Sequence, residues 1–221
     1  MKTLFINGSP KGRRGNSGTF IETITSEMKS AYVVKNLIQE KVKNIVEEIP
    51  KYDRIIIVMP LYIHTTPAIV TELFEEMKVN TQQGKQIGYI VQAGFEESET
   101  AKYLVNYLQS YTKRMQFGYM GTIVKPGVAG LSIMPKFMFN KLFKQLRILG
   151  KEYDETHAFS KEMIEMLGDP YTLSKKQVKL LTSKPVVMIN KAGFCYFLRK
   201  NKAYRIRRDK PFLLRNEALQ K

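Results

Sequence analysis

Residues 3–29, TLFINGSPKGRRGNSGTFIETITSEMK, hold a short apolar run, a polar loop and a helical pattern in succession. The run from Thr3 to Ile6 ends at Asn-Gly-Ser-Pro, as a buried strand does where it meets a loop. Residues 11–18 are rich in Gly, Ser and Asn, which predicts a loop. From 19 to 29 the apolar side chains recur at helical spacing. The stretch therefore predicts a strand, a loop and a helix.

The same alternation continues to about residue 150. The segment 54–59, RIIIVM, is a solid β-branched run, typical of a parallel strand buried on both faces. Strands are predicted at 3–6, 32–34, 54–59, 86–91 and 117–124, and helices at 19–29, 42–49, 68–77, 98–115 and 136–149. With right-handed crossovers this order predicts an α/β fold, a doubly wound five-stranded parallel sheet in three α/β/α layers. Ligands of such sheets bind beyond the carboxyl ends of the strands, here at loops 8–18, 60–67 and 92–98.

Composition excludes several classes of site. The chain of 221 residues has one Cys and two His, which excludes a disulfide framework and a cysteine-built zinc or iron–sulfur centre within one chain, and argues against a histidine-rich metal site. No apolar run approaches the roughly 20 residues that cross a bilayer. The N-terminus lacks the apolar region of a signal peptide. We therefore expect a soluble cytoplasmic protein without a metal.

The net charge of +16 is concentrated near the C-terminus. Residues 1–100 hold 12 basic and 12 acidic residues, whereas residues 171–221 hold 14 Lys or Arg and two Asp or Glu. The basic charge therefore belongs to an appendage and does not describe the whole chain. We expect a ligand-binding domain at 1–150 and a basic C-terminal extension at 151–221.

The loop after the first strand favours a phosphate. The expected helix begins directly after it, and the first N–H groups of a helix lack intrahelical partners and favour an anion. Ser9, Asn16 and Ser17 supply polar groups, and Lys11, Arg13 or Arg14 supply charge. The spacing matches neither the Walker A loop nor the dinucleotide GxGxxG. From spacing alone a phosphate site and a plain helix cap are both open.

Three loops together resemble one family. Residues 8–11 (GSPK) with 15–17 (GNS) resemble the FMN-phosphate loop of flavodoxin-fold NAD(P)H-dependent FMN oxidoreductases, the relatives of FMN reductases and quinone reductases. Residues 59–67 (MPLYIHTTP) resemble the second flavin loop, and residues 92–97 (QAGFEE) resemble the third, near the pyrimidine side of the ring. The resemblance covers residues 1–125, with a weaker match at 201–204 and 209–211.

The resemblance implies a flavodoxin-like fold, FMN as cofactor and NADH or NADPH as co-substrate. It implies hydride transfer through flavin N5 to a small acceptor: a quinone, a nitro or azo compound, or free flavin. No side chain is expected to do covalent chemistry, because the cofactor carries the reaction. A homodimer is also implied. The implied flavin-binding residues are Ser9, Lys11, Asn16, Ser17, Pro60, Leu61, Tyr62, Ile63, Ala93, Gly94, Phe95 and Glu97.

Some features depart from the family. Residues 33–39 lack the cysteine cluster of members that relay electrons through iron–sulfur. Glu96 stands where family sequences often have Pro. The rival interpretation is a flavodoxin-like electron carrier or a flavin-binding interaction module that docks a redox partner. Small carrier flavodoxins are usually acidic and lack a long extension, so this chain favours the enzyme.

The C-terminal extension has three interpretations. Residues 186–198 are apolar with one lysine, and residues 199–215 are basic with interleaved aromatics. The favoured interpretation is that the extension packs across the flavin domain or a dimer mate. The second is contact with an anionic membrane surface. Binding of a nucleic acid or another acidic partner is a third and is not favoured.

Overall fold

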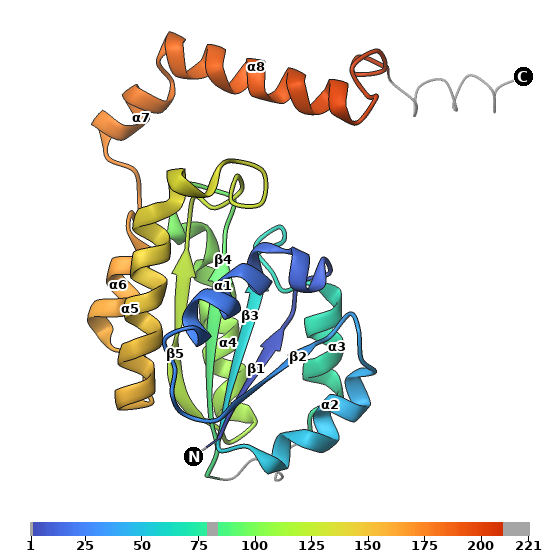
Figure 1. Cartoon of the computed structure of the whole chain (residues 1–221), viewed down its shortest axis with the longest axis vertical. Helices are drawn as coiled ribbons and strands as arrows, with labels where there is room; N and C mark the ends of the chain where they lie inside the picture. Colours follow the sequence, from blue (N-terminus) through green and yellow to red (C-terminus); the bar gives the residue numbers. More distant parts are fainter. Residues whose placement is uncertain (1, 79–83, 210–221) are drawn as a thin grey trace, which may run out of the picture. The chain divides into compact units, whose positions relative to one another are not determined.

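The computed structural model describes residues 2–78 and 84–209, and Figure 1 shows the chain. Five strands alternate with helices in the first two thirds of the chain, and only helices follow. The elements are β1 (Thr3–Asn7), η1 (Gly12–Arg14), α1 (Asn16–Thr25), β2 (Tyr32–Asn36), α2 (Val42–Glu48), η2 (Ile49–Lys51), β3 (Arg54–Pro60), α3 (Ala68–Glu76), β4 (Gln86–Gln92), η3 (Ser98–Ala101), α4 (Lys102–Arg114), β5 (Gly118–Lys125), η4 (Lys136–Phe139), α5 (Asn140–Thr156), α6 (Lys161–Gly168), α7 (Lys175–Leu181) and α8 (Lys184–Lys200).

All five strands are parallel and lie in the order β2-β1-β3-β4-β5. This order changes direction at β1 and β3, where doubly wound sheets bind their ligands. The short segment Tyr32–Asn36 does form the edge strand β2, with Phe5 of β1 aligned to Val34. The predicted α/β/α sandwich is confirmed.

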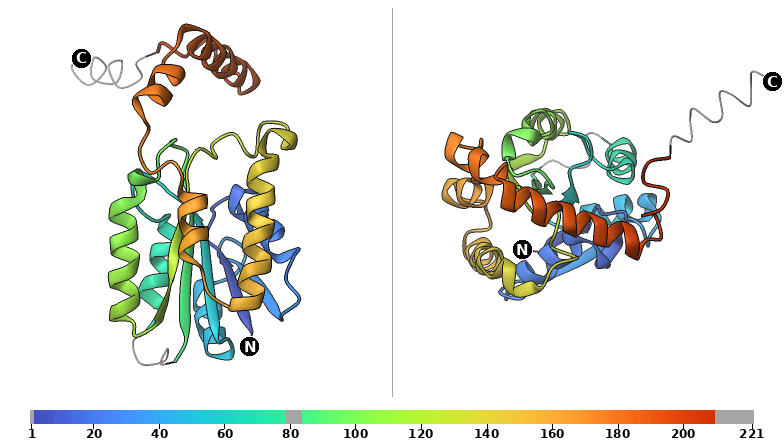
Figure 2. Two further views of the ribbon diagram at one scale, coloured as in Figure 1. Left: turned by 90° about the vertical axis from the view of Figure 1, so that its left-hand side faces the viewer. Right: turned by 90° about the horizontal axis from the view of Figure 1, so that it is seen from above.

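Helices cover both faces of the sheet (Figures 1 and 2). Alternate strand residues point to opposite faces. Leu4 and Ile57 belong to a core with side chains of α2, α3 and α4, whereas Phe5 and Ile56 belong to a core with side chains of α1, α5 and α6. Because β1 and β3 are fully buried along most of their length, the strand ends that meet the loops are held rigidly.

Two predicted boundaries need correction. The loop predicted over residues 11–18 is too long, because α1 begins at Asn16 and places Ser17 and Gly18 in its first turn. Gly15 is extended, with φ −83° and ψ 168°, and starts the helix. Gly18 fits inside the turn because a Cβ there would come within 2.2 Å of the Arg13 carbonyl oxygen. The helix ends at Thr25 rather than at residue 29.

The domain boundary expected at residue 150 is also wrong. It falls inside α5, and the compact unit runs to Thr172. Tyr153, Phe159, Met163 and Leu167 are all buried in the core on the α1 face. The chain from α5 to α6 is therefore part of the sheet domain, and the extension begins at Leu173.

The second unit, Leu173–Lys221, holds α7 and α8. A capping box formed by Ser174 and Gln177 starts α7. Pro185 lies in the first turn of α8, a position that suits its fixed φ. None of the described helices is both long enough and apolar enough to cross a bilayer.

Candidate functional site

A cavity of about 260 Å³ lies at the carboxyl ends of β1, β3 and β4. The loops that follow these three strands and the loop after β5 meet there. Its lining residues are Ser9, Lys11, Asn16, Pro60, Leu61, Tyr62, Gln92, Ala93, Gly94, Val128, Ala129, Ser132 and Ile133. Ligand sites are usually about 300–1,000 Å³, so this cavity suits a flat ligand that it covers in part.

The loop after β1 is folded tightly against the sheet. The Gly8 amide donates to the Val58 carbonyl at 2.9 Å, and the Ser9 amide donates to the Asn7 side-chain carbonyl at 3.0 Å. The Lys11 amide donates to Ser9 Oγ at 3.2 Å. These bonds place Ser9 and Lys11 at the cavity wall.

The first turn of α1 faces the same end of the sheet. Gly15 precedes it and makes no side-chain cap, since glycine has no side chain. The ten-residue helix therefore begins with backbone N–H groups that Gly15 does not cap and with the positive end of its dipole. Lys11 lines the cavity, whereas the exposed Arg13 and Arg14 do not. This combination suits a phosphate group.

Gln92 carries a buried donor that has no partner among the described residues. Its Oε1 accepts a hydrogen bond from Ser17 Oγ at 3.0 Å, and its side chain is 3% exposed. Nε2 is buried and unpartnered. An unpaired buried donor costs about 1–3 kcal/mol, so its persistence at a cavity wall points to a ligand acceptor.

The loop after β3 is strained. Tyr62 and Thr65 exchange two backbone hydrogen bonds of 3.0 Å, and the two residues between them have positive φ, 47° at Ile63 and 64° at His64. A β-branched residue in that region is an outlier. Such strain gathers at binding sites, where the surrounding structure holds it.

His64 supports this loop rather than the cavity. Its Nδ1 donates to the Thr100 carbonyl at 2.6 Å, because a carbonyl can only accept. Its ring stacks on Phe95 with centroids 6.2 Å apart. The hydrogen bond and the ring contact of His64 therefore join the loop after β3 to the segment after β4 beside the cavity.

The loop after β5 closes the fourth side. The Ala93 amide donates to the Lys125 carbonyl, and the Val128 amide returns a bond to the Ala93 carbonyl, at 2.9 and 3.1 Å. Asn16 Nδ2 donates to the Val128 carbonyl at 2.8 Å. Burial, followed by the charge of Lys141, lowers the pKa of Lys125 at the base of this loop.

The structure brings together eight of the twelve residues expected around the ligand, namely Ser9, Lys11, Asn16, Pro60, Leu61, Tyr62, Ala93 and Gly94. The other four lie outside the lining. Ser17 is buried behind Gln92, whereas Ile63 and Phe95 are 90% and 58% exposed beside the cavity. Glu97 does not line the cavity, and its backbone carbonyl accepts a hydrogen bond from Thr100 Oγ1.

Sequence reasoning missed Gln92 and residues 128–133. Gln92 is the first residue of the stretch QAGFEE. A polar residue directly after an apolar strand indicates a site at the strand's carboxyl end, so this position could have been found from the sequence. The loop after β5 follows Lys125-Pro126-Gly127 and carries no recognisable motif.

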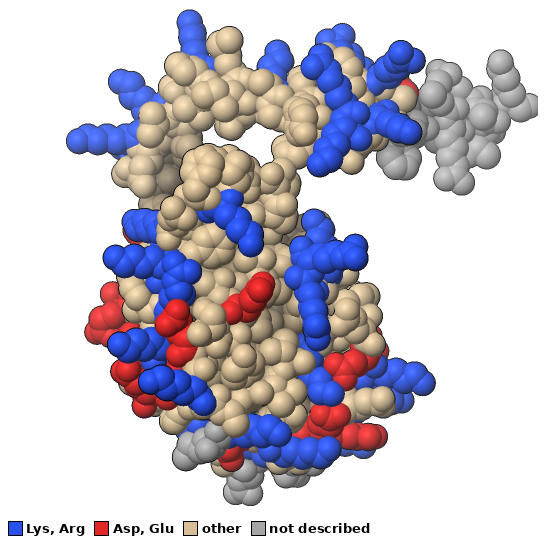
Figure 3. All heavy atoms as spheres, viewed as in Figure 1, with Lys and Arg blue, Asp and Glu red and all other residues tan. Residues whose placement is uncertain are grey.

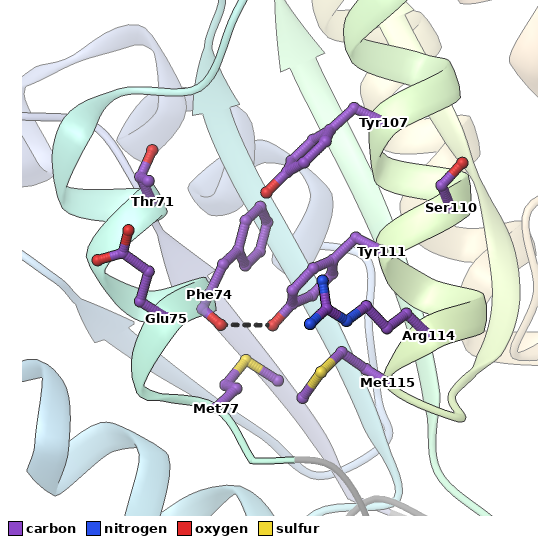
Figure 4. Close-up of a pocket in the computed structure, with 9 residues that line it drawn as sticks. All are labelled: Thr71, Phe74, Glu75, Met77, Tyr107, Ser110, Tyr111, Arg114 and Met115. Atoms are coloured by element: carbon purple, nitrogen blue, oxygen red, sulfur yellow. Dashed lines mark hydrogen bonds between the residues drawn. The ribbon is translucent and has the colours of Figure 1, made fainter.

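Larger cavities lie elsewhere. Two, of about 360 and 350 Å³, lie between α2 and α3 and beside α1 and β2. One of about 440 Å³ lies between α3 and α4, where Tyr111 donates to the Phe74 carbonyl and stacks on the Phe74 ring (Figure 4). One of about 670 Å³ lies between α4, β5 and α6. None of these four combines the first turn of α1, the buried donor of Gln92 and the ends of β1, β3 and β4, so we assign the site to the cavity of about 260 Å³.

Comparison with known proteins supports this fold. No protein-family model matches the chain, and no curated protein matches it in sequence. Among solved structures it is similar to an NADPH-quinone reductase from P. pentosaceus, at 19% identity over 70% of this chain and 98% of that one, with a TM-score of 0.57. An FMN-dependent NADH-azoreductase from Bacillus anthracis, solved in complex with FMN, is 12% identical over 70% and 100%, with a TM-score of 0.51.

A third similar structure is the Trp repressor binding protein of Bacillus subtilis, 14% identical over 66% of this chain and 99% of that one, with a TM-score of 0.55. At these identities the likeness shows the fold. The chain has the flavodoxin-like fold expected from its loops.

Proposed function

We propose that this flavodoxin-like protein binds FMN at the four-loop cavity and is an NAD(P)H-dependent oxidoreductase. The observation that carries the proposal is Gln92, a residue that lines the cavity beside the N-terminus of α1 and whose buried Nε2 has no partner among the described residues. Similar structures named as quinone reductase and azoreductase support the general class.

The residues present fit FMN. The first turn of α1, Ser9 and Lys11 supply donors and one charge for its phosphate. Leu61, Tyr62, Ala93 and Gly94 offer apolar side chains and backbone for a flat ring. Gln92 Nε2 offers one hydrogen bond to an acceptor of the ring or ribityl chain.

FMN, when bound, would accept a hydride at N5 from NADH or NADPH and pass electrons to a quinone, a nitro or azo compound, or free flavin. The protein's own residues bind and orient. Ser17 fixes the amide of Gln92, and the exchanged bonds of Tyr62 and Thr65 set the loop after β3. His64 acts as a positioning residue, because its Nδ1 is committed to the Thr100 carbonyl.

The rival is a carrier or flavin-binding module. One observation favours this interpretation. Ile63 and Phe95 are exposed beside the cavity, so the edge of the site is open to a docking protein.

We also propose a homodimer in which a second copy covers the cavity edge formed by Ile63 and Phe95. Sedimentation equilibrium measures the molar mass in solution. A protein that is still a monomer at a concentration of roughly 50 μM overturns the homodimer.

The deciding experiment is a visible absorption spectrum of the purified protein with added FMN, followed by anaerobic NADH or NADPH. Bound flavin that bleaches with a nicotinamide supports the oxidoreductase and identifies the donor. Bound flavin that does not bleach supports the carrier. Absence of binding at saturating FMN overturns the site.

A further inference from the structure

The described part of the second unit, residues 173–209, has no core of its own. We call it the C-terminal helical unit. No residue of α7 or α8 is buried. Helices of seven and 17 residues that bury nothing are poorly stabilised, because most helical stability comes from packing an apolar face. The unit therefore requires something to cover it.

The middle of α8 is apolar on nearly every side. Residues 185–198 contain one charged residue, Lys191. Met188 and Ile189 are 70% and 69% exposed, and Phe194 and Tyr196 are 63% and 60% exposed. A helix that is apolar all round is covered by a protein core or by lipid. Exposed patches of this kind mark protein or membrane contacts.

Basic residues flank this apolar middle. Residues 173–209 hold 11 Lys or Arg and a single acidic residue, Asp209. Lys175, Lys176, Lys179 and Lys184 precede the middle, and Arg199 and Lys200 begin a basic run after it. Figure 3 shows Lys and Arg side chains, in blue, along this unit. The covering surface must therefore be both apolar and negatively charged.

Charge selects the occupant. A second copy of the unit would bring two strongly positive surfaces together. The sheet domain, residues 1–172, is itself positive, with 22 basic and 18 acidic residues. A nucleic acid would satisfy the basic residues and leave the apolar middle in water. An anionic lipid surface satisfies both, since its phosphates attract Lys and Arg and its acyl boundary takes apolar side chains.

We propose that the C-terminal helical unit binds anionic lipid surfaces, with α8 lying in the plane of the interface. Fourteen helical residues extend roughly 21 Å, short of the roughly 30 Å hydrocarbon core, so α8 lies along the surface. Met188, Ile189 and Tyr196 lie on one side of α8 by helical spacing and enter the acyl boundary. Lys191 extends its ammonium to the headgroups. This proposal is independent of flavin.

The test uses the full chain and vesicles of phosphatidylcholine with or without phosphatidylglycerol. The chain contains no Trp, so Met188→Trp places a single fluorescent reporter on the lipid-facing side of α8. Tyr103→Trp places the matched control on the exposed face of α4. We expect the emission of the Met188→Trp variant to shift to the blue with anionic vesicles only, and that of the Tyr103→Trp variant to stay constant.

Vesicle flotation tests the contact itself. Tyr196→Glu should weaken binding to anionic vesicles at least tenfold, whereas Tyr103→Glu should leave it unchanged. Equal binding to neutral vesicles overturns the electrostatic part of the proposal. Failure to bind either vesicle overturns the whole. In that case, Tyr196→Glu dissociating a dimer identifies a second copy as the cover, and salt-sensitive binding of a DNA oligonucleotide identifies a nucleic acid.

Discussion

Ser17 and Gln92 are joined by a hydrogen bond of 3.0 Å, although 75 residues separate them in the chain. The bond ties the first turn of α1 to the last residue of β4. Because Ser17 donates to Oε1, the amide is oriented with Nε2 as its free group. A helix and a strand thereby hold the side-chain amide of Gln92, a residue that lines the cavity, in one orientation.

Removal of this donor should weaken FMN binding more than it weakens the fold. Gln92→Met keeps the length of the side chain and abolishes the donor. We expect the Kd for FMN to rise about tenfold, about 1.4 kcal/mol, while the free energy of unfolding of the ligand-free protein changes by less than about 1 kcal/mol. Titration of FMN fluorescence and urea unfolding measure the two quantities.

Gln145→Met is the matched control, because Gln145 is a buried glutamine on α5 that does not line the cavity. Its FMN affinity should equal that of the wild type. If both variants bind FMN normally, Gln92 is not a ligand of the flavin.

Lys11 should act on the phosphate and not on the ring. Lys11→Met removes the lysine that lines the cavity. We expect FMN affinity to fall about fivefold, about 1 kcal/mol for a solvent-exposed charge, and the loss to shrink with added salt. Riboflavin, which lacks the phosphate, should bind the variant and the wild type equally. A parallel loss for riboflavin would place Lys11 against the ring.

Much of the fold and part of the site could be predicted, because both rest on local patterns. The solid run 54–59 gives a buried strand, and loops that follow parallel strands must meet at one edge. Gln92 and residues 128–133 could not be selected in this way. Their roles depend on contacts such as Asn16 to the Val128 carbonyl, which join residues 112 positions apart.

The wrong domain boundary had a different cause. The predicted boundary follows the last expected helix, 136–149, although Phe159, Met163 and Leu167 recur at helical spacing beyond it and are buried. Apolar periodicity was the better guide to where the sheet domain ends. The start of α1 was missed because Gly18 argues against a helix unless its contact with Arg13 is known.

Gly150 should not tolerate a side chain. A Cβ there would lie 2.1 Å from the Ile24 carbonyl oxygen, where α5 crosses α1. We expect Gly150→Ala to lower the free energy of unfolding by about 2–3 kcal/mol, since overpacking must move one helix. Gly193→Ala in α8 meets nothing within 4 Å and should cause no loss. Urea unfolding compares them, and equal stability of the two variants would show that the crossing is loose.

Alkaline pH should weaken the anchor between α5 and β1. Tyr153 OH lies 3.0 Å from Thr3 Oγ1, and burial raises the pKa of this phenol above its ordinary 10.0. As the pH rises above 10, the phenol ionises in the unfolded chain before it ionises in the folded chain. The free energy of unfolding that this group contributes below pH 10 is therefore lost as the pH rises, by up to about 1.4 kcal/mol per pH unit.

Tyr153→Phe isolates that contribution. At pH 8 it should cost about 1 kcal/mol, the net value of one hydrogen bond, and the difference from wild type should narrow between pH 9 and 11. The exposed Tyr103→Phe serves as control and should show no such narrowing. A difference that is constant with pH would mean that Tyr153 ionises as readily in the folded chain as in the unfolded one.

The turn after β3 should be stabilised by a residue that accepts positive φ. Ile63 has φ 47° and is 90% exposed, so its side chain gains little from packing and its backbone is strained. Asn favours this first central position of a hairpin turn. We expect Ile63→Asn to raise the free energy of unfolding by about 1 kcal/mol, because a left-handed β-branched residue costs roughly 1–2 kcal/mol.

Ile38 is the control, because it is an exposed isoleucine in the turn after β2 without positive φ. Ile38→Asn should not raise the free energy of unfolding. If Ile63→Asn is more stable and also binds FMN less tightly, the strain serves the site; if its stability equals that of the wild type, the two exchanged bonds of Tyr62 and Thr65 hold the turn without strain.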